Sequence, residues 1–162
     1  MEKRILLTAF HNTSSQMLLE DAEETTLILP NDKQRDSQIL LELLSSEQFD
    51  YILSLGQKPN IRDKLYIETT ARKGDGYLVT DVDCEQLQRL FQQHGISARI
   101  SNRAGTSYCN ELYWNGLQHL TRNVPNTHMV FLHIPFEKNL DDPEDFRRKF
   151  RIVVRCIREG QL

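Results

Sequence analysis

Short apolar runs of strand length alternate along the chain with longer segments whose apolar residues recur every three or four positions. The short runs predict strands at residues 4–10, 25–29, 51–55, 65–70, 98–101 and 129–133. The periodic segments predict helices over about 14–23, from a cap at 31–32 through 44, from 82 to a stop at 94–95, from a cap at 106 through 120, and from 142 to before 160. Strands that alternate with helices in this way form a mostly parallel sheet covered on both faces. The sequence therefore predicts an α/β protein with a three-layer α/β/α sandwich.

The predicted strand at residues 65–70 carries apolar and polar side chains in alternation. Leu65 and Ile67 would lie on one face of the sheet, and Glu68 on the other. The polar residues 72–76 follow this strand. We expect them to form the turn that separates it from the next helix.

Length and composition limit the class of protein. A chain of 162 residues fits one domain of common size, so residues 1–162 are expected to fold as a single unit. Hydrophobic residues make up 39% and charged residues 27% of the chain, a balance that supports a folded core and excludes disordered and low-complexity classes. The formal net charge of −3 gives no basic field to gather phosphates, so no nucleic-acid partner is expected.

The longest apolar runs, such as residues 5–7 and 27–30, are too short for a membrane segment. A helix needs about 20 apolar residues to span a bilayer, and a signal-peptide core needs about 7 to 15. We expect no membrane partner and predict a cytoplasmic location.

The three cysteines, Cys84, Cys109 and Cys156, are odd in number and widely spaced. Their spacing fits neither a disulfide framework nor a zinc site. The five histidines show no HExxH pattern, and the chain contains no glycine-rich phosphate-binding motif. We therefore expect no bound metal and no nucleotide chemistry.

Three residues are candidates for catalysis. Cys109 lies in the first turn of a predicted helix, where free N–H groups favour a thiolate and can bind an oxyanion. His133 lies near the carboxyl end of a predicted strand, where parallel sheets place functional residues, and Glu68 is placed to orient a base. A buried cysteine, a loop histidine and a surface carboxylate would show the same local patterns. Three cysteines and five histidines also make fifteen pairs, so the residues alone do not select a triad.

Two segments resemble pyroglutamyl-peptidase I, the pyrrolidone-carboxylate peptidase family. Residues 101–110, Ser-Asn-Arg-Ala-Gly-Thr-Ser-Tyr-Cys-Asn, are similar to its cysteine segment, and residues 131–136, Phe-Leu-His-Ile-Pro-Phe, are similar to its histidine segment. The step of 24 residues from Cys109 to His133 is also similar. Weaker likenesses to the opening strand, the second strand end, the glycine-glutamine strand end and the acidic segment occur at residues 5–10, 29–30, 55–57 and 68–71. The resemblance covers nearly the whole chain.

The resemblance implies the same α/β/α fold and a cysteine exopeptidase that removes an N-terminal pyroglutamyl residue from a peptide or small amide without a cofactor. By this resemblance Cys109 is the nucleophile, His133 the general base and Glu68 the carboxylate that orients it. Phe10 would form a wall of an apolar slot, and Gln57 a polar contact to substrate. Family members often self-associate, which makes a homo-oligomer compatible with this interpretation.

The chain also departs from the family pattern in two places. A second aromatic residue that follows Phe10 in the family is missing, and a long segment after Ala71 is reduced to residues 72–76. These losses bear on the substrate pocket more than on the triad. Two alternatives therefore remain: a triad amidase or thioesterase with a different small acyl substrate, and a non-catalytic relative that acts as a binding module.

Overall fold

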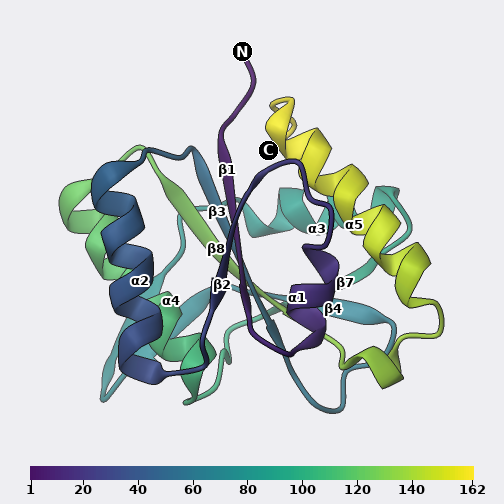
Figure 1. Cartoon of the computed structure of the whole chain (residues 1–162), viewed down its shortest axis with the longest axis horizontal. Coiled ribbons are helices and arrows are strands. Elements are labelled where there is room, and N and C mark those ends of the chain that lie inside the picture. The colour runs from purple at the N-terminus through teal and green to yellow at the C-terminus, as the bar shows by residue number, and fades with distance from the viewer.

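The computed structural model describes residues 1–162 as eight strands, five α-helices and one 3₁₀ turn (Figure 1). The strands are β1 (Ile5–Phe10), β2 (Thr25–Leu29), β3 (Tyr51–Gln57), β4 (Lys64–Glu68), β5 (Thr70–Lys73), β6 (Gly76–Val79), β7 (Ser97–Ser101) and β8 (His128–Ile134). The helices are α1 (Ser14–Leu18), α2 (Lys33–Ser46), α3 (Cys84–Gln93), α4 (Tyr108–Asn123) and α5 (Pro143–Arg158), with the 3₁₀ turn at Glu137–Asn139.

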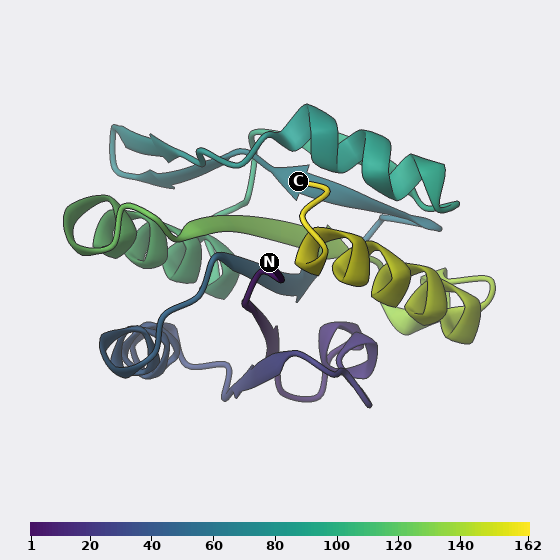
Figure 2. The ribbon, with the colours of Figure 1, turned by 90° about the horizontal axis from the view of Figure 1, so that it is seen from above.

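Six strands form one sheet in the order β2-β1-β3-β8-β4-β7. The first four of these run parallel to one another, whereas β4 is antiparallel to β8, and β7 is parallel to β4. Helices α2 and α4 cover one face of the sheet, and α1, α3 and α5 cover the other (Figure 2). The predicted three-layer sandwich with a mostly parallel sheet is confirmed.

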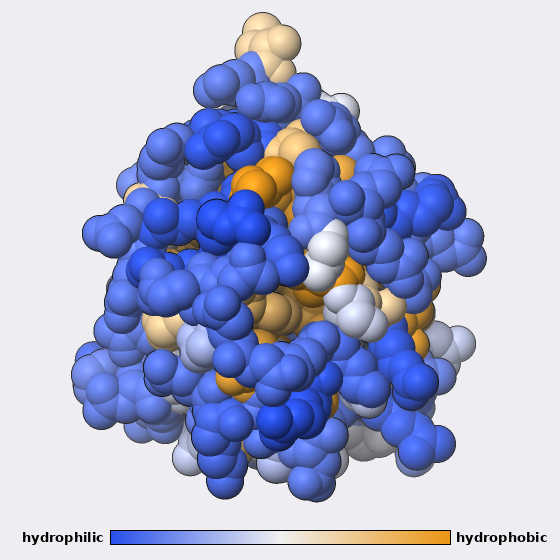
Figure 3. All heavy atoms as spheres, turned by 90° about the vertical axis from the view of Figure 1, so that its right-hand side faces the viewer, coloured by the Kyte–Doolittle hydropathy of each residue, from blue (hydrophilic) through white to orange (hydrophobic).

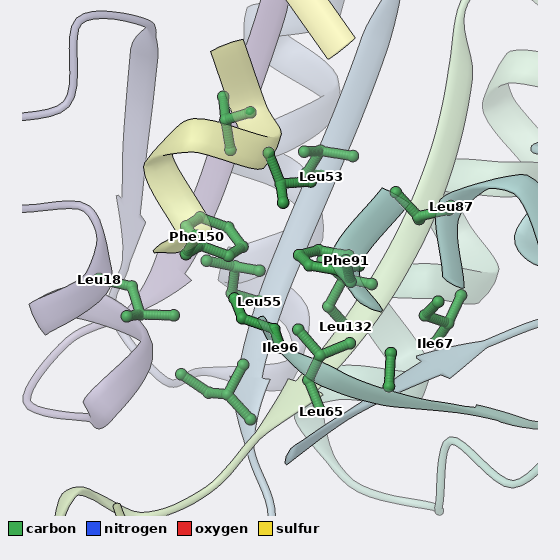
Figure 4. Packing of buried hydrophobic residues seen from close by; sticks show 14 of the residues in the cluster. Leu18, Leu53, Leu55, Leu65, Ile67, Leu87, Phe91, Ile96, Leu132 and Phe150 are labelled. Atoms are coloured by element: carbon green, nitrogen blue, oxygen red, sulfur yellow. The ribbon is translucent and has the colours of Figure 1, made fainter. Parts of the chain in front are cut away.

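The two faces of the sheet pack against different cores. The larger apolar cluster lies between the sheet and α1, α3 and α5, and includes Leu55, Phe91, Leu132 and Phe150 (Figure 4). A smaller cluster lies under α2 and α4. Alternation along the strands also turns four buried polar side chains toward the α2/α4 face, namely Thr8, Ser54, Glu68 and His133. We therefore expect a functional site on the α2/α4 face of the sheet.

The observed elements differ from the predicted ones in two places. Of the polar residues 72–76, only 74–75 form a turn, and this turn joins β5 to β6 in a two-stranded hairpin beside α4, with Gly74 at a φ of +58° (Figure 2). We expected these residues to separate the strand from the next helix, and the sequence analysis missed the further strand that the β-prone residues 77–79 form before that helix. Helix α1 is also shorter than predicted: it ends at Leu18, three residues before the left-handed Asp21.

None of the five helices combines the length and the apolar character that crossing a bilayer requires. On the α5 side of the molecule, hydrophilic side chains cover most of the surface, and the hydrophobic atoms that remain visible lie between them (Figure 3).

Candidate active site

Phe10, Gly56 and His133 lie near the carboxyl ends of β1, β3 and β8, at one level across the sheet. The register pairs Gly56 with His133, and it pairs Thr8 with Ser54. Phe10 follows Thr8 by two residues, and Gly56 follows Ser54 by two, so both lie on the same face of the sheet as that pair. Because Gly56 is the register partner of His133, Phe10 and Gly56 also lie at the level of His133. This is the edge of the parallel strands, where α/β proteins place their sites.

Glu68 and His133 are joined by a short hydrogen bond in the interior. His133 Nδ1 lies 2.6 Å from Glu68 Oε2, and the two residues are 3% and 0% exposed. The antiparallel pairing of β4 with β8 sets Glu68 opposite Phe131 and Tyr66 opposite His133, so all four side chains share one face. Because Nδ1 is occupied by Glu68, the other ring nitrogen, Nε2, remains for a reaction partner.

The carboxyl group of Glu68 stays ionised although it is buried. Burial by itself would raise the pKa of Glu68, but the hydrogen bond with His133 and the positive charge of Lys58 hold that pKa below its ordinary value of 4.5. Lys58 Nζ lies 3.8 Å from Glu68 Oε2 and above the ring of Tyr66. The ionised Glu68 therefore orients the His133 imidazole as a carboxylate orients a general base.

Cys109 is the second residue of α4, and its thiol rests on β3. A Cβ atom placed on Gly56 would lie 2.5 Å from Cys109 Sγ and 3.0 Å from the ring of Phe131. Glycine is therefore required beneath the thiol. Since Gly56 is the register partner of His133, the thiol lies beside the imidazole. No hydrogen bond joins Cys109 to His133 in this structure.

The Cys109 thiol is protonated in this environment. Burial first, and the negative charge of Glu68 second, raise the pKa of the Cys109 thiol to about 12. The helix start alone favours a thiolate, and this expectation was wrong for the free protein because desolvation outweighs it. A thiolate at Cys109 therefore requires that a neighbouring base take the proton.

The first turn of α4 offers backbone donors beside the thiol. The N-cap is Ser107 rather than Thr106, and the Ser107 hydroxyl makes no capping hydrogen bond. The first N–H groups of a helix have no partner within the helix. The groups at the start of α4 therefore remain available for an oxyanion.

The two predicted substrate contacts, Phe10 and Gln57, lie in different surroundings. Phe10 is buried at 3% exposure in the α2/α4 core, at the same level as Gly56. The side-chain oxygen of Gln57 accepts hydrogen bonds from the Ser14 N–H at 3.0 Å and from its hydroxyl at 3.2 Å. Gln57 thus ties β3 to the start of α1, and only its amide nitrogen is left to meet a ligand.

Two charged residues of this region were not found from the sequence. Lys58 reaches Glu68 from the loop after β3, and nothing in its neighbourhood in the sequence indicates this. Asp36 is buried at 1% exposure in the first turns of α2. A signal existed for Asp36, since it precedes the buried Leu40 by four residues and so lies on the apolar face of the helix.

A change of Glu68→Gln should lower stability in a manner that depends on pH. The pKa of Glu68 is depressed in the folded chain, so its ionised form stabilises the fold above pH 4.5, and this contribution is lost as the pH falls through the folded pKa. The difference in free energy of unfolding between wild type and Glu68→Gln should be largest at neutral pH and shrink below about 4.5. Urea unfolding of both proteins across this range measures it, and a difference that does not change with pH would contradict an ionised Glu68.

Known proteins resemble this chain in sequence and in fold. The family model described as pyroglutamyl peptidase matches residues 64–145, half of the chain. A pyrrolidone-carboxylate peptidase of Thermosipho melanesiensis is 28% identical over 76% of this chain and 73% of its own length. One of Streptococcus pyogenes is 26% identical over 86% of this chain and 75% of its own length.

Two solved structures share the fold. The pyroglutamyl peptidase I of Bacillus amyloliquefaciens has a TM-score of 0.86 at 20% identity, covering 99% of this chain and 97% of its own. The pyrrolidone carboxyl peptidase of Fervidobacterium islandicum has a TM-score of 0.85 at 22% identity, covering 98% and 99%. With half of its residues matched by the family model, the chain belongs to the pyroglutamyl peptidase family.

Proposed function

We propose that this chain is a cysteine exopeptidase that hydrolyses the amide bond after an N-terminal pyroglutamyl residue. One observation carries the proposal: the buried 2.6 Å hydrogen bond between Glu68 and His133 lies beside the Cys109 thiol, which rests on Gly56. Membership of the pyroglutamyl peptidase family supports the choice of substrate. The substrate class is a peptide or a small amide with this residue at its amino end.

In the proposed reaction, His133 takes the proton of the Cys109 thiol through Nε2, and the sulfur attacks the carbonyl carbon of the pyroglutamyl residue. The resulting tetrahedral intermediate collapses when His133 returns the proton to the leaving amine and the C–N bond breaks. Water, deprotonated by His133, then attacks the thioester and releases pyroglutamate and the free thiol. Because the thiol starts protonated, this proton transfer is an essential part of the attack.

Glu68 acts as a positioning residue in this scheme. Its hydrogen bond to Nδ1 holds the imidazole, leaves Nε2 for the thiol proton and stabilises the imidazolium that forms. The free N–H groups at the start of α4 receive the negative charge that develops on the carbonyl oxygen. Phe10 and the Gln57 amide nitrogen contribute to the acyl pocket.

No step of the proposed reaction needs a cofactor. The cytoplasmic location and a homo-oligomeric state of the protein remain predictions.

Release of aminomethylcoumarin from its pyroglutamyl amide tests the proposal. We expect slow cleavage with a raised KM, because the missing second aromatic removes stacking worth about 0.5 to 1.5 kcal/mol, or up to roughly tenfold in binding. Prolyl and acetyl-alanyl coumarin amides should be cleaved less well. Cys109→Ala should abolish turnover, whereas Cys84→Ala and Cys156→Ala, which alter buried thiols on other helices, should retain it.

One observation favours a second candidate, a non-catalytic relative that binds the same acyl group. The Cys109 thiol has a pKa raised to about 12 and forms no hydrogen bond with His133. A folded wild-type protein that binds pyroglutamyl peptides but releases no coumarin from any of the three amides would favour this binding module. Faster cleavage of the acetyl-alanyl amide would instead favour a triad amidase of different specificity.

A further inference from the structure

A hollow of about 500 Å³ lies at the β7 edge of the sheet and carries two positive charges. Its lining includes Arg99 of β7 and Arg103 of the loop before α4, together with Tyr66 and Ser101, and contains no acidic residue. Both arginines are exposed, and neither takes part in an ion pair. A concave surface lined by charges of one sign attracts ligands of the other.

The hollow lies on the face of the sheet that carries the catalytic pair. Tyr66 is the register partner of both His133 on β8 and Arg99 on β7, so these three side chains form one row across the sheet. Ser101 is in the same way the register partner of Glu68. The residues that alternate with this set on β4 belong to the core of the opposite face. The hollow therefore adjoins the candidate active site along the row.

Lys58 connects the hollow to the active site. Its Nζ donates a hydrogen bond to the backbone oxygen of Arg103 at 3.0 Å and lies 5.6 Å from the centre of the Tyr66 ring. The same Nζ lies 3.8 Å from Glu68 Oε2. Two residues of the hollow and the carboxylate of the catalytic pair thus meet at one side chain. The charge of Lys58 is matched by Glu68, whereas those of the two arginines are left for a ligand.

The order of the strands sets the side on which a leaving amine lies. The thiol rests on Gly56 of β3, His133 lies on β8, and β4 and β7 follow, each strand about 4.8 Å from the next. In the proposed reaction His133 gives its proton to the leaving nitrogen, so this nitrogen lies on the His133 side of the thiol. The acyl group then lies on the other side of the carbonyl carbon, toward Phe10 of β1. The leaving peptide extends toward β4 and β7.

The distance to the arginines suits the first residues of the leaving peptide. Arg99 lies two strands beyond His133, about 10 Å away, and an extended peptide advances about 3.3 Å for each residue. Long side chains on both partners shorten this span further. An acidic side chain in the first or second residue after the cleaved bond can therefore meet the guanidinium groups.

Building on the proposed function, we infer that the hollow binds the leaving segment of the substrate and that Arg99 and Arg103 favour an acidic side chain in its first two residues. The substrate class is thereby a pyroglutamyl peptide with an acidic leaving segment. Arginine suits this role because its planar guanidinium donates paired hydrogen bonds to a carboxylate. The preference is local, since the net charge of −3 on the whole chain would by itself repel an acidic peptide.

Two peptides of equal size that differ by one charge test this inference. We expect wild type to cleave pyroglutamyl-glutamyl-alanine amide with a kcat/KM about 10-fold above that of pyroglutamyl-glutaminyl-alanine amide at low ionic strength. This ratio corresponds to about 3- to 5-fold for each arginine, near the upper limit for exposed ion pairs. It should fall in about 0.5 M sodium chloride, because salt screens exposed charges.

Variants of the arginines should change this ratio of the two kcat/KM values. Arg99→Gln and Arg103→Gln should each lower it about threefold or more, and the double reversal Arg99→Glu with Arg103→Glu should bring it below one. Because both substrates meet the same protein, a loss of folded enzyme leaves the ratio unchanged. Arg89→Gln, which alters an exposed arginine of α3 on the opposite face of the sheet, is the matched control and should keep the wild-type ratio.

The coumarin amide separates this inference from the proposed activity, because its leaving group carries no charge. Cleavage of the coumarin amide with equal kcat/KM for the two peptides would overturn the inference and leave the proposed function intact. If wild type cleaves nothing, calorimetry on the Cys109→Ala protein decides. Tighter binding of the glutamyl peptide by about 10-fold, lost in Arg99→Gln, would uphold the role of the hollow; equal binding of both peptides, or none, would overturn it.

Discussion

Replacing His133 with alanine is expected to lower kcat on the pyroglutamyl coumarin amide by about 10²- to 10⁴-fold, the usual contribution of a general acid-base residue. The loss should be severe here because burial and the negative charge of Glu68 raise the pKa of the Cys109 thiol, so the attack needs a base that takes its proton. Glu68→Gln should retain more activity, since the amide can still hold the imidazole although it cannot stabilise the imidazolium. Steady-state kinetics of both variants give the comparison.

The control for His133 is His94, which lies at the end of α3 with its Nε2 3.5 Å from Cys156 Sγ. His94→Ala should leave kcat unchanged, and circular dichroism should show that all three variants are folded. Wild-type rates in His133→Ala would exclude this residue as the base. A Glu68→Gln variant less active than His133→Ala would contradict the orienting role of the carboxylate.

Adding one methyl group at Gly56 is expected to reduce kcat about 100-fold. A Cβ at this position would lie 2.5 Å from Cys109 Sγ, so the thiol must move away from β3 and from the imidazole. Displacing a reacting group by about 1 Å can cost about 10²-fold in rate.

Gly116→Ala is the matched control for Gly56→Ala. Its added methyl group meets the flexible end of Met129 in the same core, away from the thiol. This variant should change the melting temperature and leave kcat close to wild type, whereas Gly56→Ala should lose rate at any temperature where it is folded. Equal kcat in the two variants would show that catalysis by the thiol does not depend on its position against Gly56.

All six strands of the main sheet could be predicted from the sequence, because β1, β3 and β8 are nearly continuous apolar runs buried on both faces. The hairpin strand β6 could not. Its residues Tyr77 and Val79 are 64% and 59% exposed, so no burial pattern marked them as a strand. The antiparallel direction of β4 relative to β8 could not be predicted either, since strand direction depends on pairing partners that are distant in the chain.

The candidate site could be predicted in part. Cys109, His133 and Glu68 were selected by resemblance, and the structure joins Glu68 to His133 and sets Cys109 beside them. The closed surroundings of the thiol could not be predicted, because desolvation depends on which helices cover it. The same holds for Asp36, whose position on an apolar helix face was visible in the sequence but whose lack of a partner was not.

Strand β8 has a consequence for the order of folding. β3 and β4 follow one another in the chain, yet β8, made about 60 residues later, lies between them. Until residues 128–134 leave the ribosome, the two halves of the sheet lack the strand that joins them, and Glu68 lacks its histidine. Such distant pairing slows folding and exposes strand edges in the meantime. A partly synthesised chain therefore holds its nucleophile without a base, and the thiol becomes competent only when the centre of the sheet closes.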